Sequence, residues 1–333
     1  MNFELTQEQH MIKKMTQEFA KDELLPNVVK RDIEKIWPKE QIKKMADLGL
    51  LGMMVEPEWG GNGMDTISYA IAMEEISKVD ASASVIMSVN NSLVCSIFQK
   101  YGNEAQKEKY LKPLAKGDKL GCFSLSEPQS GSDASNMKTY AVKDGDEYII
   151  TGTKNWVTNG ISSDIIMVFC VTEKNVGHKG ISCFIVEKGI DGLSTGKAEE
   201  KLGIRSSDTC ELYFDQVRVS KNNLVGNLGQ GFKIALSTLD GGRIGIASQA
   251  LGIAQAAFEA AVAYSQERKA FGAPISKLQA IQFKIADMAT RIEGARLLTW
   301  RAAYLKDQGV RYSKEAAMAK LVASEMSTYV THQ

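Results

Sequence analysis

The sequence has few of the residues on which metal and hydrolytic chemistry usually depend. It contains three histidines, His10, His178 and His332, which lie far apart, and five scattered cysteines that never form a CxxC pair. Walker A, GxSxG and HExxH sequences do not occur. These absences argue against a zinc or other metal site, a disulfide framework, a P-loop and a serine hydrolase. The odd number of scattered cysteines favours a reducing compartment.

An excess of either charge is lacking too. Lys and Arg together number 40 and Asp and Glu together number 40, so no net field attracts nucleic acid or an acidic membrane surface. The N-terminal stretch MNFELTQEQH has neither the charged nor the apolar region of a signal peptide, and no apolar run approaches the 18 residues of a membrane span. We therefore expect a soluble, cytoplasmic protein with no membrane span and no nucleic-acid partner.

The first hundred or so residues have the apolar spacing of helices. Thr6 and Gln9 form a capping box ahead of an apolar helical face, and Asp65 is placed to cap a later helix. Residues 81–101 are apolar on nearly all sides, which predicts a buried helix. A layer of helices is therefore expected at the start of the chain.

The period changes twice after that layer. Short β-branched runs begin near Lys119, with Asp144-Gly145 suited to a tight hairpin turn, and long helical stretches return from Gly231. Helices of that length must bury their apolar faces against one another, as in an antiparallel bundle. The predicted class is α+β, with an N-terminal helical domain over residues 1–118, a middle β-barrel or sandwich domain over 119–227 and a C-terminal helical bundle over 228–333.

Two stretches of the β region could carry a site, although each also has a plain structural explanation. FSLSEPQSGSDAS, residues 123–135, offers hydroxyls and glycines that let backbone N–H groups approach an anion or the edge of a flat ring. Composition alone favours a surface loop there. TKNWVTNG, residues 153–160, places Trp156 beside hydroxyl groups near a strand end. The indole could flank a planar cofactor, but on its own core packing is favoured.

Two further stretches lie in the C-terminal helices. In LDGGRIG, residues 239–245, Asp240 and Arg243 are one turn apart around two glycines, which favours either a close ligand or helix approach or a simple i,i+3 ion pair. In ERKAFGAPISKLQAIQ, residues 267–282, Arg268 and Phe271 precede a turn and Gln279 starts the next helix. The planar fork of an Arg suits a diphosphate, and the alternative is a solvated helix end.

The four stretches, in this order on a plan of helices, strands and helices, closely resemble the acyl-CoA dehydrogenase family. The resemblance covers essentially the whole chain. It is closest to the short-chain, butyryl-type members, through MSVNNSL at residues 87–93, LDGGRIGIA and RKAFGAPISKLQAIQF.

The resemblance implies a set of site residues. It implies that the flavin of FAD and its diphosphate are lined by Phe123, Leu125, Ser126, Gly131 and Ser132. Trp156 and Thr158 would cover the flavin ring, with the Thr158 hydroxyl near N5. Contacts to the FAD of a partner subunit are implied for Arg268, Phe271 and Gln279, and contacts to the acyl-CoA substrate for Ser132, Asp240 and Arg243.

The reaction implied is α,β-dehydrogenation of a short-chain acyl-CoA thioester, of the butyryl-CoA to crotonyl-CoA type, as in fatty acid β-oxidation. A carboxylate removes the α proton, the β hydrogen leaves as a hydride to flavin N5, and an electron-transfer flavoprotein then takes the electrons. The family also implies a homo-oligomer, a homotetramer built as a dimer of dimers.

The catalytic base is where the sequence departs from the family. The usual base is a Glu in a tyrosine-glutamate-glycine-threonine segment near the C-terminus, which does not occur here, and the position that carries the Glu in some relatives is Gly242. The last helix also shows an apolar face, Met318, Leu321, Val322, Met326, Tyr329 and Val330, without a stop signal. We expect a C-terminally truncated enzyme whose base lies beyond Gln333. The alternatives are a non-catalytic flavin- or CoA-binding relative that ends at Gln333, and an acyl-CoA oxidase.

Overall fold

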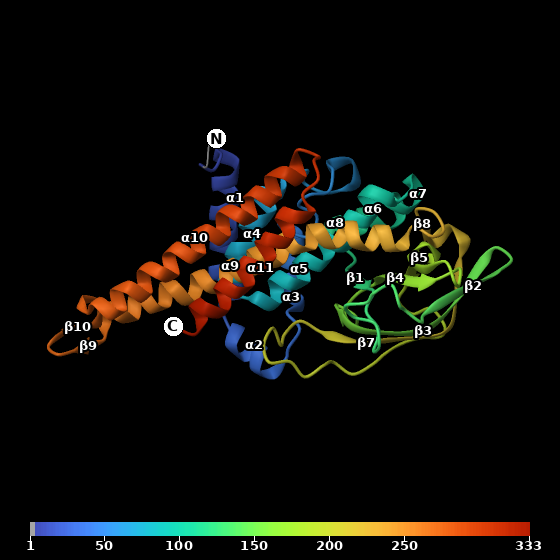
Figure 1. Cartoon of the computed structure of the whole chain (residues 1–333). Helices are drawn as coiled ribbons and strands as arrows, with labels where there is room; N and C mark the ends of the chain where they lie inside the picture. Colours follow the sequence, from blue (N-terminus) through green and yellow to red (C-terminus); the bar gives the residue numbers. More distant parts are fainter. Residues whose placement is uncertain (1–3) are drawn as a thin grey trace. The chain divides into compact units, whose positions relative to one another are not determined.

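The computed structural model describes residues 4–333, in which helices occupy both ends of the chain and strands the middle (Figure 1). The first helices are α1 Gln7–Phe19, α2 Val28–Glu34, α3 Lys39–Asp47, α4 Thr66–Ser77, α5 Ala81–Ser88, α6 Ser96–Tyr101, α7 Glu104–Gln106 and α8 Lys112–Lys116. The strands that follow are β1 Gly121–Ser124, β2 Tyr140–Asp144, β3 Glu147–Thr158, β4 Ile165–Val171, β5 Ile181–Glu187, β6 Leu193–Thr195, β7 Thr209–Ser220 and β8 Leu224–Val225. The C-terminal part consists of α9 Gly231–Glu267, β9 Lys269–Ala270, β10 Ala273–Pro274, α10 Gln279–Asp307 and α11 Ser313–Thr331. The predicted order of helices, strands and helices is confirmed.

The chain divides into two compact units. One consists of residues 4–29, 65–85 and 243–333, and the other of residues 30–64 and 86–242. We call them the helical unit and the sheet unit. The finer division at residues 118 and 227 stays a prediction.

Short-range signals in the sequence set several element ends. The Thr6 hydroxyl accepts a hydrogen bond from the Gln9 backbone N–H at 3.2 Å, and the Gln9 side chain accepts one from the Thr6 N–H at 3.0 Å. Asp65 accepts from the N–H of Ser68 at 2.6 Å and so caps α4. Gly145, with φ of +61°, makes the turn between β2 and β3. The predicted capping box, helix cap and hairpin turn are therefore confirmed.

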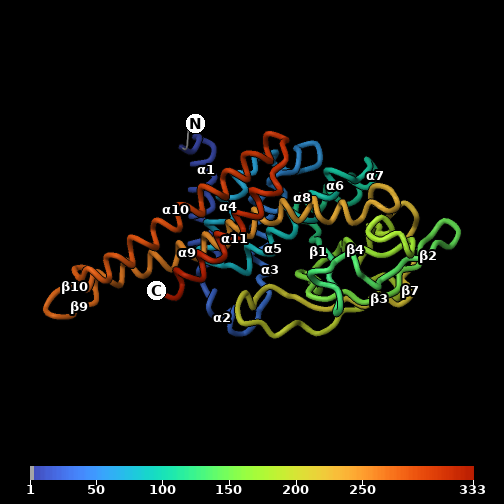
Figure 2. The backbone as a smooth tube through the Cα atoms, in the orientation of Figure 1, coloured from blue at the N-terminus to red at the C-terminus, as the bar shows by residue number. Residues whose placement is uncertain are grey.

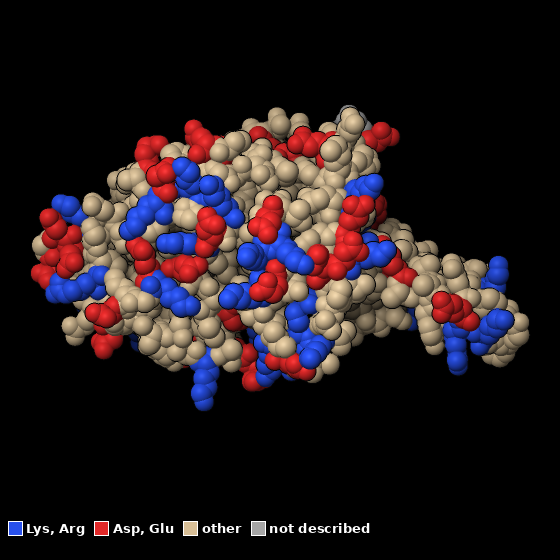
Figure 3. All heavy atoms as spheres, turned by 180° about the vertical axis from the view of Figure 1, so that it is seen from behind, with Lys and Arg blue, Asp and Glu red and all other residues tan. Residues whose placement is uncertain are grey.

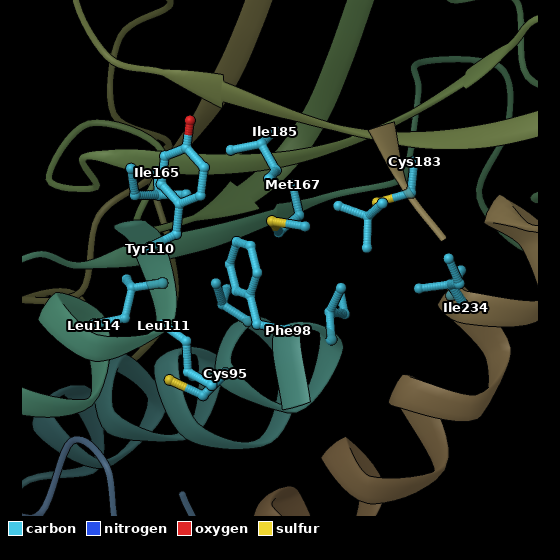
Figure 4. Packing of buried hydrophobic residues seen from close by; sticks show 14 of the residues in the cluster. Cys95, Phe98, Tyr110, Leu111, Leu114, Ile165, Met167, Cys183, Ile185 and Ile234 are labelled. Carbon is cyan, nitrogen blue, oxygen red and sulfur yellow. The ribbon is translucent and has the colours of Figure 1, made fainter. Parts of the chain in front are cut away.

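One mixed sheet organises the sheet unit. Its strand order is β6-β7-β3-β2-β4-β5-β8, and β1 pairs in parallel with β4. Every residue of β4 except its last is buried, because alternate residues face two different apolar clusters. Met167 packs with Phe98 and Tyr110 of the neighbouring helical segments (Figure 4), whereas Val168 packs with the residues of the other face. The sheet thus forms a rigid base for the loops at its edge.

The apolar segment 81–101 is interrupted by a π-helical turn, Val89–Cys95, between α5 and α6. Asn90 donates to the Leu51 carbonyl at 2.9 Å and accepts from the Gly121 N–H at 3.1 Å, so it ties this turn to the start of β1. Asn91 likewise accepts from the Met53 N–H at 2.9 Å. The polar residues of MSVNNSL are therefore hydrogen-bonded inside the protein.

Two helical segments of the described chain are long and apolar enough to cross a membrane by length and composition. They are residues 81–101, with mean hydropathy 1.4, and α9, with mean hydropathy 1.2. The expectation that no run approaches this length was therefore wrong. The first is 83% buried inside the protein, and core helices of soluble proteins pass the same test.

In the helical unit, α9 and α10 are long helices joined by the β9–β10 hairpin, as the orange part of the tube in Figure 2 shows. Their contacts with α11 use small residues, including Ala254, Ala295 and Ala319. The Asp307 carboxylate accepts from the Thr66 N–H at 2.9 Å, which joins the end of α10 to the start of α4. Alanines permit close helix packing, and the polar contacts fix its register.

The apolar face predicted for the last helix is only partly right. Met326 and Val330 are buried, but Met318 and Leu321 are 39% and 56% exposed. The buried stripe of α11 joins Met326 and Val330 to the small residues Ala316, Ala319 and Ala323 instead of to Met318 and Leu321. Close packing against α10 selects alanine there, and alanine contributes little to an apolar pattern.

Candidate functional site

The loop after β1 carries the first group of predicted site residues, all in the sheet unit. Phe123 is half-buried, with its ring 4.9 Å from that of Phe169, and Leu125 is buried. Ser126 is half-buried, while Gly131 and Ser132 are exposed. An added Cβ on Gly131 would meet no atom within 4 Å. The loop therefore has an apolar base and an open rim of hydroxyl and backbone groups.

Trp156 lies near the end of β3 and is 61% exposed, so the interpretation of this residue as core was wrong. Its φ is +59°, and the pairing of β3 with β7 shifts register between Lys154 and Val157. This β-bulge leaves Lys154 and Val157 buried while the indole between them points outward. A bulky residue at positive φ is strained, and such strain concentrates at functional sites.

The structure brings the loop and the bulge together. The Asn155 N–H donates to the Ser126 carbonyl at 2.8 Å, and the Lys154 ammonium donates to the Leu125 carbonyl at 3.0 Å. Thr158, half-buried, follows the bulge on the same strand. The bulge that carries the exposed indole is therefore hydrogen-bonded to the loop at neighbouring residues within the sheet unit.

LDGGRIG lies inside α9, where Asp240 and Arg243 are both half-buried. Gly241 and Gly242 are buried, and an added Cβ on Gly242 would lie 2.8 Å from a methyl group of Leu93. A close approach by another segment therefore accounts for glycine at position 242. This agrees with the sequence argument that two adjacent glycines in a helix need such a reason.

The fourth group of predicted site residues lies around the β9–β10 hairpin of the helical unit. Arg268, Phe271 and Gln279 are all exposed, and Phe271 is 96% exposed at the turn, with φ of +52°. The Ile275 N–H donates to the Arg268 carbonyl at 2.8 Å and closes the hairpin. The Phe271 ring and the Arg268 side chain are therefore both accessible at this hairpin.

Charge and thiols add no second site among residues 4–333. On the face shown in Figure 3, Lys and Arg side chains are mixed with Asp and Glu side chains. Within the described part of the chain no group of three or more His, Cys, Asp or Glu residues could hold a metal ion. All five cysteines are free and buried, and burial raises the pKa of the Cys95 and Cys122 thiols to about 12.

Comparison with protein families matches the three parts of the chain in order. Residues 6–118 match the acyl-CoA dehydrogenase N-terminal domain, residues 122–217 the middle domain and residues 229–333 the C-terminal domain. The chain belongs to the acyl-CoA dehydrogenase family. The fold expected for an acyl-CoA dehydrogenase, with an N-terminal helical part, a middle sheet part and a C-terminal helical part, is thereby confirmed.

Several relatives of this acyl-CoA dehydrogenase are similar over nearly its whole length. The short-chain specific acyl-CoA dehydrogenase, mitochondrial, of Bos taurus is 53% identical over 330 residues, which cover 99% of this chain and 80% of the relative. The solved butyryl-CoA dehydrogenase from Megasphaera elsdenii has a TM-score of 0.98 and 46% identity and covers 100% and 88% of the two chains. A chain described as "Electron transferring flavoprotein of Acidaminococcus fermentans: Towards a mechanism of flavin-based electron bifurcation" has a TM-score of 0.98, 50% identity and coverage of 100% and 87%.

The residues of the sheet unit fit the FAD that acyl-CoA dehydrogenases use. An exposed indole held outward on a bulge offers a flat surface for a ring, and the open rim at Gly131 and Ser132 leaves room for backbone contacts with a diphosphate. Sequence reasoning missed Lys154 and the role of Glu127 in this loop. The signal that was available is a lone glutamate in one candidate stretch and a lone lysine in the other.

Proposed function

We propose that this protein catalyses FAD-dependent α,β-dehydrogenation of a short-chain acyl-CoA, of the butyryl-CoA to crotonyl-CoA type, and passes electrons to an electron-transfer flavoprotein. The observation that carries the proposal is the outward Trp156 on its bulge, bonded through Asn155 to the loop after β1. Membership of the acyl-CoA dehydrogenase family and similarity to proteins named short-chain and butyryl-CoA dehydrogenases support the substrate class.

We assign the flavin contacts to the surface that the loop and the bulge share. Bound FAD supplies the acceptor for the β hydrogen, which leaves the thioester as a hydride. The chain's own residues hold and enclose that group: Trp156 covers a ring face and excludes water, and the Thr158 hydroxyl donates a hydrogen bond at the ring edge. Contacts to the flavin and its diphosphate come from Phe123, Leu125, Ser126, Gly131 and Ser132.

Acyl-CoA contacts are proposed for Ser132, Asp240 and Arg243, where a guanidinium can bond phosphate oxygens and a carboxylate can accept from amide N–H groups. Arg268, Phe271 and Gln279 are proposed to hold the FAD of a second subunit, in a homotetramer arranged as a dimer of dimers. The 96% exposure of Phe271 supports this role, because a partner surface would cover the ring.

Glu127 is not the base in this proposal. A base that removes an α proton needs a raised pKa. Although burial raises the pKa of Glu127, Lys154 and the surrounding hydrogen bonds outweigh it and hold that pKa below its usual value. Its carboxylate is also fully engaged within the loop.

We also propose a cytoplasmic location, supported by the free state and burial of all five cysteines. The protein would then work in a reducing compartment. A fluorescently tagged copy that cofractionates with membranes after a salt wash would contradict this assignment.

Spectral titration tests the proposed function without requiring turnover. The protein is loaded with FAD, and butyryl-CoA or octanoyl-CoA is added anaerobically while the flavin absorbance is followed. We expect FAD to be retained and butyryl-CoA to perturb the flavin bands at lower concentration than octanoyl-CoA. Failure to retain FAD, or a lower half-saturation concentration for octanoyl-CoA, would contradict the proposal.

A further inference from the structure

The Glu127 side chain lies inside the loop after β1 and closes it. Glu127 is 3% exposed, and its carboxylate accepts from the backbone N–H groups of Lys138 at 2.6 Å and Thr139 at 3.0 Å. The Glu127 backbone also exchanges two hydrogen bonds with Ser130, at 2.9 and 3.0 Å. One carboxylate therefore joins the first residues of the loop to the last.

Lys154, on β3, forms an ion pair with that carboxylate. Its side chain is fully buried, and its ammonium donates to Glu127 at 2.9 Å, to the Leu125 carbonyl at 3.0 Å and to the Met137 sulfur at 3.8 Å. These contacts use the three donors of an ammonium group. Lys154 therefore holds both arms of the loop at once, Leu125 on one side and Met137 on the other.

The same two residues also link the loop to the bulge, which are the two segments proposed to contact the flavin. Leu125 precedes Ser126 in the loop, and Lys154 is two residues before Trp156 on β3. The Asn155 N–H donates to the Ser126 carbonyl at 2.8 Å, so the segments are joined at successive residues. A change in the distance between Lys154 and Glu127 would move the loop relative to the bulge that carries the indole.

Stability alone does not account for an ion pair at this place. Replacing a buried pair by well-packed apolar residues is often neutral or stabilising, because taking two charges out of water is costly. Apolar residues could not accept hydrogen bonds from the Lys138 and Thr139 N–H groups, and they could not donate a hydrogen bond to the Leu125 carbonyl. The contacts that only this pair can make are those that set the shape of the loop.

We propose that Glu127 and Lys154 are positioning residues for FAD, which set the loop of residues 125–139 against Trp156 without touching the cofactor. The inference rests on the proposed placement of the flavin between that loop and the bulge. It adds two residues that act on FAD affinity through other groups.

The test measures FAD affinity and folding separately. Apoprotein is titrated with FAD while flavin fluorescence is followed, and the melting temperature of the apoprotein is recorded. Lys154→Met leaves the Glu127 carboxylate buried without its partner, and should weaken FAD binding by roughly 10- to 100-fold, as expected for losing hydrogen bonds from a charged group. Lys109→Met, which breaks the 2.7 Å pair with Glu187 elsewhere in the sheet unit, should leave FAD affinity unchanged.

The double variant Glu127→Gln/Lys154→Met separates positioning from stability, because it removes both charges. We expect its melting temperature to return toward that of the unaltered protein while FAD binding stays weak. If FAD affinity recovers together with the melting temperature, the pair is only structural and the inference fails.

Trp156→Ala distinguishes failure of this inference from failure of the flavin placement. If Trp156→Ala binds FAD normally, the placement of the flavin against the bulge is wrong. If Trp156→Ala weakens FAD binding but Lys154→Met does not, the placement stands and the positioning role of the pair is refuted.

Discussion

Gly252 lies where α4 and α9 approach each other so closely that one added methyl group should force the two helices apart. A Cβ at position 252 would lie 2.2 Å from the Glu74 carbonyl oxygen, 2.6 Å from the Ser77 Cβ and 3.0 Å from the Lys78 backbone nitrogen. Two of these atoms belong to the backbone, so a change of side-chain rotamer cannot relieve the overlap. The helices must move apart by roughly 1 Å to restore ordinary carbon contacts.

The size of the effect follows from two opposing terms. Overpacking at such a site costs about 3 kcal/mol, the upper part of the usual range, because backbone must move. Alanine recovers about 1 kcal/mol of helix propensity relative to glycine. Gly252→Ala should therefore lower the free energy of unfolding by about 2 kcal/mol.

Gly294 in α10 supplies a matched control. It is exposed within the helix, and an added Cβ would meet no atom within 4 Å. Gly294→Ala should therefore raise the free energy of unfolding by about 1 kcal/mol from helix propensity alone. The two substitutions are chemically identical and have opposite expected signs.

Thermal unfolding followed by circular dichroism at the helix band measures both variants. At about 2 °C for each kcal/mol in a chain of this size, the melting temperatures should differ by roughly 6 °C, with Gly294→Ala above the unaltered protein and Gly252→Ala below it. A Gly252→Ala variant that melts at or above the unaltered protein would refute the close approach of α4 and α9.

Three further predictions concern the site and the charges of the helical unit. Arg268→Ala should release FAD on extensive dialysis, and a variant that stays yellow contradicts the role proposed for Arg268. Gly242→Glu, which places a carboxylate on α9, should raise the rate of butyryl-CoA oxidation with an artificial acceptor by about 10²-fold or more once Leu93 moves aside, the usual contribution of a base, and no gain would overturn this. Burial lowers the pKa of Lys78, but the Glu259 carboxylate at 2.9 Å and Glu75 outweigh it and raise that pKa, so the pair stabilises at pH values below 10.5 and its contribution is lost as pH rises through the folded pKa. Glu259→Gln should lower the free energy of unfolding by about 0.5 kcal/mol at neutral pH, and this difference should shrink as pH rises above 10.5; a constant difference argues against the pair.

Features determined by neighbours in the sequence were predictable. Thr6 with Gln9, Asp65 and Gly145 act through atoms a few residues away, so their positions alone indicated a capping box, a helix cap and a turn. The change from period 2 to a helical period likewise predicted the order of the three parts. The four candidate stretches were noticeable because short polar residues and glycines interrupt apolar patterns, and their role in a site stays a prediction.

Features set by packing between distant segments were not predictable. Trp156 is exposed because β3 and β7 pair with a shift in register, and nothing near position 156 encodes that shift. Lys154 is buried, although lysine is almost always exposed, because it pairs with Glu127. That partner lies 27 residues earlier, so the stretch around Lys154 gives no sign of the pair. Met318 is exposed because it lies outside the face of α11 that packs in the bundle, where the contact with α10 favours small side chains.

Because every cysteine is buried, the rate at which a thiol reagent reacts can report how often the native protein opens. Cys170 on β4 and Cys183 on β5 lie in the apolar clusters on opposite faces of the sheet, so a reagent reaches these sulfurs only when the packing over those faces opens. Burial raises the pKa of Cys170 to about 12, which keeps the thiol protonated and unreactive while the sheet is closed. The rate of maleimide labelling would thus report how often that packing opens, and a single cysteine introduced on the surface could carry a fluorophore without removal of the native ones.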